Sequence, residues 1–191
     1  MSLPEYVVAN LTTKNTPEML RKIAEPLKFP LSEQDLVDLD TLSRKYDSEG
    51  SIAGLAAPQI GISKRFIVFA TPEDPSLAIW RPDLLDKMPK TIWINPSFVG
   101  VEVDGYHEDY EGCFSVEGVA GLVSRFKTIH YEAYSVNGEH ISGTVHGYLA
   151  RIIQHEIDHL NGTLFSDMAK SIITRDEYKT LREEALARGY R

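Results

Sequence analysis

The sequence has few features of a secreted, membrane or nucleic-acid-binding protein. It contains a single cysteine among 191 residues, so no disulfide can form within the chain and a reducing compartment is favoured. Lys and Arg number 20 against 28 Asp and Glu, and the resulting net charge of −8 argues against a broad DNA-binding surface. No run approaches the length of apolar sequence that a membrane-spanning helix needs, so no membrane association is expected.

The first ten residues have neither the layout of a secretory signal nor the Arg-rich character of a transit peptide. This favours the cytoplasm and leaves open a processed organellar form. The chain also has no repeat, low-complexity tract or Gly/Ser linker, and 42% of its residues are hydrophobic. We therefore expect a single domain over residues 1–191.

The first third of the chain favours helices. Thr16, followed by proline, predicts the start of a short helix that Pro26 ends. Ser32 predicts the start of a longer helix that stops at Gly50, because apolar residues recur between them at helical spacing.

The middle of the chain is strand-like. Short runs rich in β-branched and aromatic residues, bounded by Pro and Gly, lie at 65–70, 91–95, 98–103, 122–136 and 139–145. Asn137-Gly138 between the last two runs is a strong hairpin signal. Residues 71–90 contain four prolines and are expected to form an irregular loop.

Helices return in the last third. Apolar residues recur at helical spacing from Val145 to Leu160, and Thr174 with Glu177 forms a capping-box pattern for a final helix that ends near Gly189. Helices at both ends and an antiparallel middle indicate an α+β fold.

The clearest chemical signal is His155-Glu156-Ile157-Asp158-His159 within this predicted helix. Residues four apart on a helix lie one turn above each other, so both imidazoles can bind one metal ion, with Glu156 as a general base beside them. Glu156 also falls on the apolar stripe that should face the core. A buried carboxylate needs a partner or a proton, and an adjacent metal-bound water explains its position.

A catalytic metal usually has a third protein ligand. Spacing alone leaves several candidates: Cys113, His146, Asp167 and a few downstream acids. Cys113 lies in the segment Tyr-Glu-Gly-Cys-Phe-Ser, where the glycine lets the backbone approach closely. A lone cysteine is also often a small buried hydrophobe, so the residues alone do not choose.

A third cluster is Gly-Leu-Ala-Ala-Pro-Gln, from Gly54 to Gln59. Small residues that end in a primary amide suit a place where the backbone packs against a ligand and Gln59 donates a hydrogen bond. The alternative is a tight turn packed under a helix.

In this order, the three clusters resemble the motifs of peptide deformylases, which remove the formyl group from the N-terminal methionine of new polypeptides. The similarity runs from about Leu20 to Asp167, and the motif spacing looks more like the type II subclass. The resemblance implies antiparallel or mixed sheets packed around a central helix that carries the His-Glu-x-x-His motif, with helices at both ends. It also implies that N-formyl-methionyl nascent peptides are the substrate.

The resemblance assigns roles to individual residues. Cys113, His155 and His159 would bind one divalent metal ion. Glu156 would be the general acid and base, and the Gln59 amide with the Phe114 backbone N–H would hold the oxyanion. Gly54, Tyr148 and Ile152 would contact the substrate, the last two as walls of an apolar methionine pocket, although both also fit ordinary core positions.

The family implies Fe²⁺ as the metal in cells, with Ni²⁺, Co²⁺ or Zn²⁺ in purified protein. By analogy with the family, a transient contact with the ribosome and a monomeric state are expected. The sequence departs from the family pattern at Ile52, where a glycine is usual, and at Phe114, where leucine is usual. Arg125 is a candidate ion-pair partner for Glu111, next to the cysteine motif.

Two alternatives remain at this point. A zinc metallopeptidase also uses His-Glu-x-x-His, generally with a third ligand downstream. The second alternative is a catalytically silent relative that binds peptides. The complete set of motif residues argues against this alternative.

Overall fold

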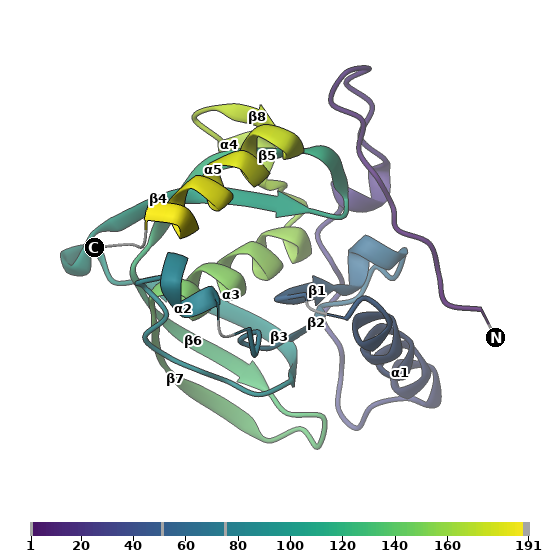
Figure 1. The fold of residues 1–191 in the computed structure, drawn as a ribbon. Coiled ribbons are helices and arrows are strands. Elements are labelled where there is room, and N and C mark those ends of the chain that lie inside the picture. The colour runs from purple at the N-terminus through teal and green to yellow at the C-terminus, as the bar shows by residue number, and fades with distance from the viewer. Residues whose placement is uncertain (1, 51, 75, 189–191) are drawn as a thin grey trace.

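Helix α3, Gly147–Leu160, occupies the centre of the molecule between two antiparallel sheets (Figure 1). The computed structural model describes residues 2–50, 52–74 and 76–188. Ten residues of α3 are buried, among them the polar Arg151 and Gln154. The helix is buried on nearly all sides because it has a sheet against each face, so it carries more than the one apolar stripe expected from the sequence.

The larger sheet has five strands in the order β1-β2-β3-β6-β7, and every neighbouring pair is antiparallel. Its strands are β1 Gly54–Ala56, β2 Phe66–Phe69, β3 Thr91–Gly100, β6 Thr128–Tyr134 and β7 His140–His146. Ile67, Trp93 and Ile129 of this sheet are fully buried and pack with α3 in one apolar cluster. Strand β1 lies at the edge of the sheet, which places the first sequence motif there.

The smaller sheet has the order β4-β5-β8 and is also antiparallel, with β4 Tyr106–Cys113, β5 Val116–Phe126 and β8 Ile172–Thr174. The chain changes sheets between β5 and β6. At this point the Gln154 side chain of α3 accepts a hydrogen bond from the backbone N–H of Phe126 and donates one to its carbonyl, at 3.1 and 3.0 Å. The central helix therefore ties both sheets together.

The remaining helices lie outside this layered core. They are α1 Glu33–Ser48, α2 Leu77–Trp80, α4 Phe165–Met168 and α5 Arg175–Arg188, with short 3-10 helices at Glu18–Leu20, Ala57–Ile60 and Glu102–Asp104. Helix α1 packs on the side of β1 and β2, and α5 lies over the smaller sheet (Figure 1). None of the helices in the described ranges is long and apolar enough to cross a bilayer.

Several expectations are confirmed. The α+β architecture around a central motif-bearing helix is present. Ser32 forms a complete capping box with Asp35 at the start of α1, and Gly50 follows its end with a φ of 75°. Asn137-Gly138 joins β6 and β7. Thr174 and Glu177 exchange capping hydrogen bonds at α5, while Gly189, the predicted end of that helix, lies outside the described residues.

Other expectations are wrong. The helix predicted from Thr16 to Pro26 is only a 3-10 turn. The run 91–95 and the first part of the run 98–103 belong to one strand, which ends at Gly100, and a 3-10 helix follows at Glu102–Asp104. The strand continues because a bulge at Asn95 absorbs the Asn-Pro pair, and the Asn95 amide makes two hydrogen bonds to the Leu27 backbone, each 2.9 Å. The run 122–136 is divided between two sheets, and β4 and β8 were not predicted because their sequences are largely polar or short.

The contact between α3 and the larger sheet should dominate stability. Ile153 is fully buried in the cluster that joins them. We expect Ile153→Ala to lower the free energy of unfolding by about 2–5 kcal/mol, since it leaves a cavity. Chemical denaturation measures this. Leu181→Ala on α5, where the side chain is 45% exposed, is the control and should change stability by less than about 1 kcal/mol. Equal losses in both variants would contradict the central role of α3.

Candidate metal centre and catalytic site

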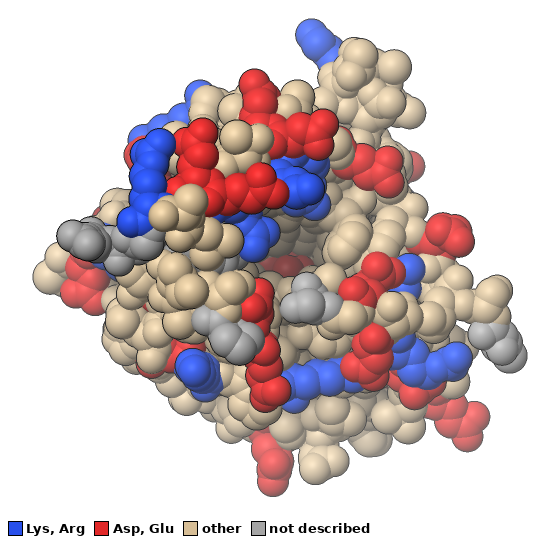
Figure 2. Space-filling model, viewed as in Figure 1, with Lys and Arg blue, Asp and Glu red and all other residues tan. Residues whose placement is uncertain are grey.

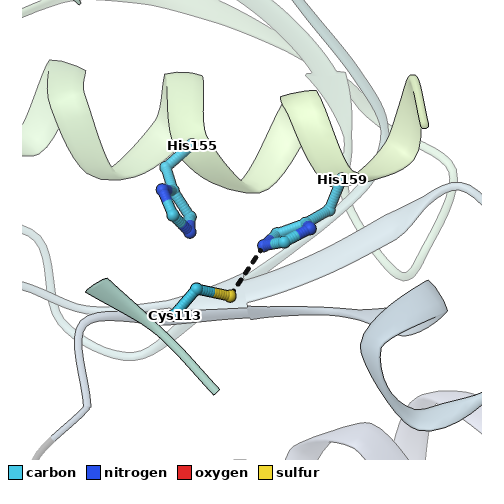
Figure 3. A group of neighbouring side chains, drawn as sticks. All are labelled: Cys113, His155 and His159. Atoms are coloured by element: carbon cyan, nitrogen blue, oxygen red, sulfur yellow. Dashed lines mark hydrogen bonds between the residues drawn. The ribbon is translucent and has the colours of Figure 1, made fainter. Parts of the chain in front are cut away.

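Three side chains from two elements converge at the centre of the molecule. His155 and His159 point from successive turns of α3 toward Cys113 at the end of β4 (Figure 3). Their possible ligand atoms all lie within 4.8 Å of one another, and the Cys113 Sγ atom lies 3.2 Å from Nε2 of His159. Residues 42 positions apart in sequence are thus brought together because the end of β4 at Cys113 meets the helix.

The sulfur of Cys113 is surrounded by hydrogen-bond donors. The Gln59 side-chain Nε2 lies 3.2 Å from it, and the Ser115 backbone nitrogen lies 3.3 Å from it. The side chain is buried, with 6% exposed. These two donors hold the sulfur in place, and cysteine binds metal ions through this atom.

A buried carboxylate orients the first histidine. Oε2 of Glu111 lies 2.9 Å from Nδ1 of His155, which leaves Nε2 of the same ring for a ligand. Glu111 also accepts two hydrogen bonds from Arg125, at 2.9 and 2.8 Å, and one from Arg151 at 2.6 Å. Burial acts to raise the pKa of Glu111, but the bonds and charge of Arg125 outweigh it and hold that pKa well below its usual range. Glu111 is therefore a fixed anion that selects the His155 tautomer.

The Glu111–Arg125 ion pair expected from the sequence is confirmed by these distances. The second arginine, Arg151, was not predicted from the sequence. It lies four residues before His155, so helical stacking could have indicated its position beside the same carboxylate. Arg125 also pairs with Asp158, which neutralises the remaining charge of this network.

The donor set fits a divalent metal ion. One thiol and two imidazoles are ligands that zinc and other transition metals accept, and the anchored His155 supplies the expected support. Burial acts to lower the pKa of His155, but bonds to Cys113 and Glu111 hold it well above its usual range, so a positive charge is stabilised here. Of the other ligand candidates, His146 bonds to Asp86 at 2.8 Å and Asp167 to Arg21, away from this cluster.

Glu156 lies beside the cluster with only 4% of its surface exposed. Its Oε2 atom has no hydrogen-bond partner within the described residues. Burial raises the pKa of Glu156 to about 7, against the opposing charge of His155. A carboxyl group with a pKa near neutrality can both take and return a proton, as a general acid and base must.

Gly54 makes room for this carboxylate. A Cβ atom added at Gly54 would lie 2.4 Å from Oε1 of Glu156, which is closer than real side chains approach. The first motif and the helix motif therefore meet directly at this point. The glycine is required by close approach and by no special backbone angle.

Gln59 is held rigidly at the same edge. Its Oε1 atom accepts a hydrogen bond from the Ala56 backbone at 2.8 Å while its Nε2 atom contacts the sulfur. Phe114 follows Cys113; the residue is 37% exposed, and its ring stacks on Tyr6 with centroids 4.8 Å apart. At the first departure from the family pattern, the carbonyl of Ile52 accepts a hydrogen bond from Tyr46 at 2.8 Å.

A pocket of about 290 Å³ opens beside these groups. Its lining includes all of the predicted site residues except His159. Tyr148 and Ile152 are among them, as expected for pocket walls, but the lining is not purely apolar. Arg81 places its guanidinium 4.1 Å from the centre of the Tyr148 ring. Figure 2 shows a hollow on this face, with Lys and Arg side chains along its edge near α5.

Further pocket residues that were not predicted from the sequence are Arg81, Arg175, Tyr178 and Arg182. The last three come from α5. No local pattern marks them, because their position depends on β8 pairing with β5 far away in the sequence.

Comparisons with known proteins agree with this geometry. A family model described as polypeptide deformylase matches residues 8–174. Peptide deformylase 2 of Rickettsia conorii is 56% identical over 190 residues, covering 97% of this chain and 94% of that protein. Peptide deformylase 2 of Pseudomonas syringae pv. tomato is 36% identical over 151 residues, covering 78% and 80%.

A solved structure is also similar. The class I type b peptide deformylase from Acinetobacter baumannii, with Met-Ala-Ser bound, is 27% identical and has a TM-score of 0.74, covering 87% of this chain and 98% of that one. The type II subclass expected from motif spacing stays a prediction. The chain belongs to the polypeptide deformylase family, consistent with the removal of N-formyl groups from nascent peptides.

Proposed function

We propose that residues 1–191 form one catalytic domain that hydrolyses the formyl amide of N-formyl-methionyl peptides, with one divalent metal ion bound by Cys113, His155 and His159. The observation that carries the proposal is the meeting of these three side chains in an open pocket beside the buried carboxylate of Glu156, whose Oε2 atom has no hydrogen-bond partner among the described residues. A bound cation supplies a Lewis acid for the reaction.

Glu156 handles the proton in this scheme. Its carboxylate takes a proton from the water that attacks the formyl carbon and returns it to the leaving amine. Burial, which brings its pKa to about 7, makes both transfers feasible near neutral pH. Because Gly54 has no side chain, the Glu156 carboxylate can occupy the space beside it.

Two donors stabilise the negative charge that develops on the formyl oxygen. The Gln59 amide has two N–H groups, of which one faces the sulfur, while Ala56 fixes its oxygen. Its second N–H and the backbone N–H of Phe114 are the proposed oxyanion donors. Their position is set by the backbone before the reaction, so little reorganisation is needed.

The substrate peptide fits between two strand edges. Strand β1 ends the larger sheet and β4 ends the smaller one, and residues of both line the pocket. An extended peptide added to the β1 edge would contact the backbone at Gly54. Tyr148 and Ile152 would then form a wall of the methionine pocket. The bound Met-Ala-Ser in the Acinetobacter baumannii structure supports a peptide of this kind.

Further parts of the proposal come from the family resemblance. We assign Fe²⁺ as the metal in cells, with Ni²⁺, Co²⁺ or Zn²⁺ in purified protein. Oxygen would inactivate the iron form, because both Fe²⁺ and the Cys113 thiolate can be oxidised. We place the protein in the bacterial cytoplasm as a monomer that makes transient contact with the ribosome, in line with its bacterial relatives.

The activity can be tested directly with formyl-Met-Ala-Ser and protein loaded anaerobically with iron or nickel. We expect formate to be released and the peptide chain to stay intact, because the reacting bond is the formyl amide. Unformylated Met-Ala-Ser is the control. Internal cleavage of a formyl-free peptide without formate release would instead identify a metallopeptidase, and peptide binding with neither reaction would identify a silent relative.

Substitutions should separate proton transfer from metal binding. We expect Glu156→Gln to retain the metal while kcat falls by about 10²–10⁴-fold, because the general base is lost. His155→Ala should lose the metal itself. Metal analysis and formate assays on the same samples distinguish the two effects. A Glu156→Gln enzyme with nearly normal turnover would contradict the assigned role.

The contact between Gly54 and Glu156 gives a further prediction. Gly54→Ala should displace the Glu156 carboxylate and lower kcat by about 10²-fold, since small errors in position are costly in catalysis. The three atoms nearest to an added Cβ all belong to Glu156, so metal content is the internal control. Unchanged kcat in Gly54→Ala protein that still binds metal would refute the close approach.

A further inference from the structure

The mouth of the pocket is formed in part by the C-terminal helix. Arg175, Tyr178 and Arg182 of α5 line the pocket that contains Cys113 and Glu156. The Tyr178 ring packs against Tyr110 of β4 with centroids 5.9 Å apart, and β8 joins the start of α5 to β5 through the pair Val119–Thr174. The helix is thus fixed next to the same strand that carries the sulfur ligand.

Arg175 is the first residue of α5, and its backbone is held on both sides. Before it, β8 is paired with β5. After it, Glu177 accepts hydrogen bonds from the N–H and hydroxyl of Thr174 at 2.7 and 2.8 Å. The Arg175 guanidinium extends over Gly112, where an added Cβ atom would lie 2.5 Å from its Nη1. It therefore lies one residue away from the metal ligand Cys113.

The arginines of the pocket differ in how their charge is balanced. Arg151 is buried and paired with Glu111, and Arg81 is buried and paired with Asp83 at 3.0 Å and with Asp109. Arg175 is exposed, and no acidic group of the described residues lies within ion-pair distance of it. Its charge is available to a molecule in the pocket. The positive charge of Arg175 is a local feature, because the chain as a whole has a net charge of −8.

We infer that Arg175 determines substrate specificity by binding a carboxylate that the peptide presents one or two residues after its formyl-methionine. This inference rests on the proposed deformylase function. An extended peptide advances about 3.3 Å per residue, so with methionine beside the metal ligands the next two residues pass Gly112 and the guanidinium. Arginine matches a carboxylate with two parallel hydrogen bonds, which an uncharged amide side chain cannot equal.

Matched formyl peptides test the inference. Two peptide series are used, formyl-Met-X-Ala-amide and formyl-Met-Ala-X-amide, with X as Glu, Gln or Lys. Within each series only the side-chain charge at X changes, because the amide removes the charge of the C-terminal carboxylate. Formyl-Met-Ala as free acid and as amide separates a C-terminal carboxylate from a side-chain carboxylate. We expect kcat/KM to be about three- to tenfold higher for Glu than for Gln at one of the two positions, mainly through KM.

Charge reversal should identify the residue. Arg175→Glu is expected to invert the order, so that the Lys peptide becomes better than the Glu peptide. Lys179→Glu, one turn further along the exposed face of α5, makes the same change in net charge, and Lys179 does not line the pocket. It should retain the wild-type preference and activity. Arg175→Gln, which removes only the charge, should bring the Glu and Gln peptides close to equality, and thermal unfolding checks that it is folded.

Specific outcomes would overturn the inference. The first is a wild-type enzyme that prefers the Gln peptide to the Glu peptide or does not distinguish them. The second is a preference for the Glu peptide that survives Arg175→Glu. The third is a preference for the Glu peptide that is lost equally in Lys179→Glu. The last result would indicate the field of the whole helix rather than a contact. Formate release from the Gln peptides reports the proposed function by itself: no release there contradicts deformylation, whereas release without acidic preference contradicts only the role of Arg175.

Discussion

The carboxylate of Glu111 joins three elements, β4, β5 and α3, beside the proposed metal ligands. It comes from β4, accepts hydrogen bonds from Arg125 of β5 and Arg151 of α3, and orients His155 of α3. Because Glu111 lies two residues before Cys113, one strand carries both a proposed metal ligand and the anchor of another. Without this carboxylate two buried guanidinium groups would lose a partner, at a cost of about 3–5 kcal/mol, so the same group supports both the fold and the site.

The parts of the site that depend on local spacing were predictable from the sequence. The two histidines and Glu156 follow from helical periodicity, and α1 from its cap. Cys113 was one of several ligand candidates until its motif was compared with the family. Arg151 and the arginines of α5 were not predicted, because the first depends on a second sheet that covers the helix and the others on a long-range strand pair.

The neighbourhood of Glu156 shows how close packing serves chemistry. A carboxylate buried without a partner destabilises the protein, and an apolar residue in its place would cost less. Here the absence of a side chain at Gly54 admits the group, and burial places its pKa near neutrality. The unusual environment is confined to the point where the first motif meets helix α3 beside the proposed metal ligands, which is where a perturbed acid is useful.

Burial also divides the arginines of the pocket into two groups with different capacities. A guanidinium inside the protein must be paired, and Glu111, Asp83 and Asp109 provide the pairing for Arg151 and Arg81. Those charges fix the geometry of strands and helix, and they have little attraction left for a substrate. Arg175 at the water-exposed rim has no such requirement, since solvent stabilises its charge until a carboxylate arrives. Recognition of a charged substrate group is therefore located at the rim, on helix α5, which contains none of the three sequence motifs.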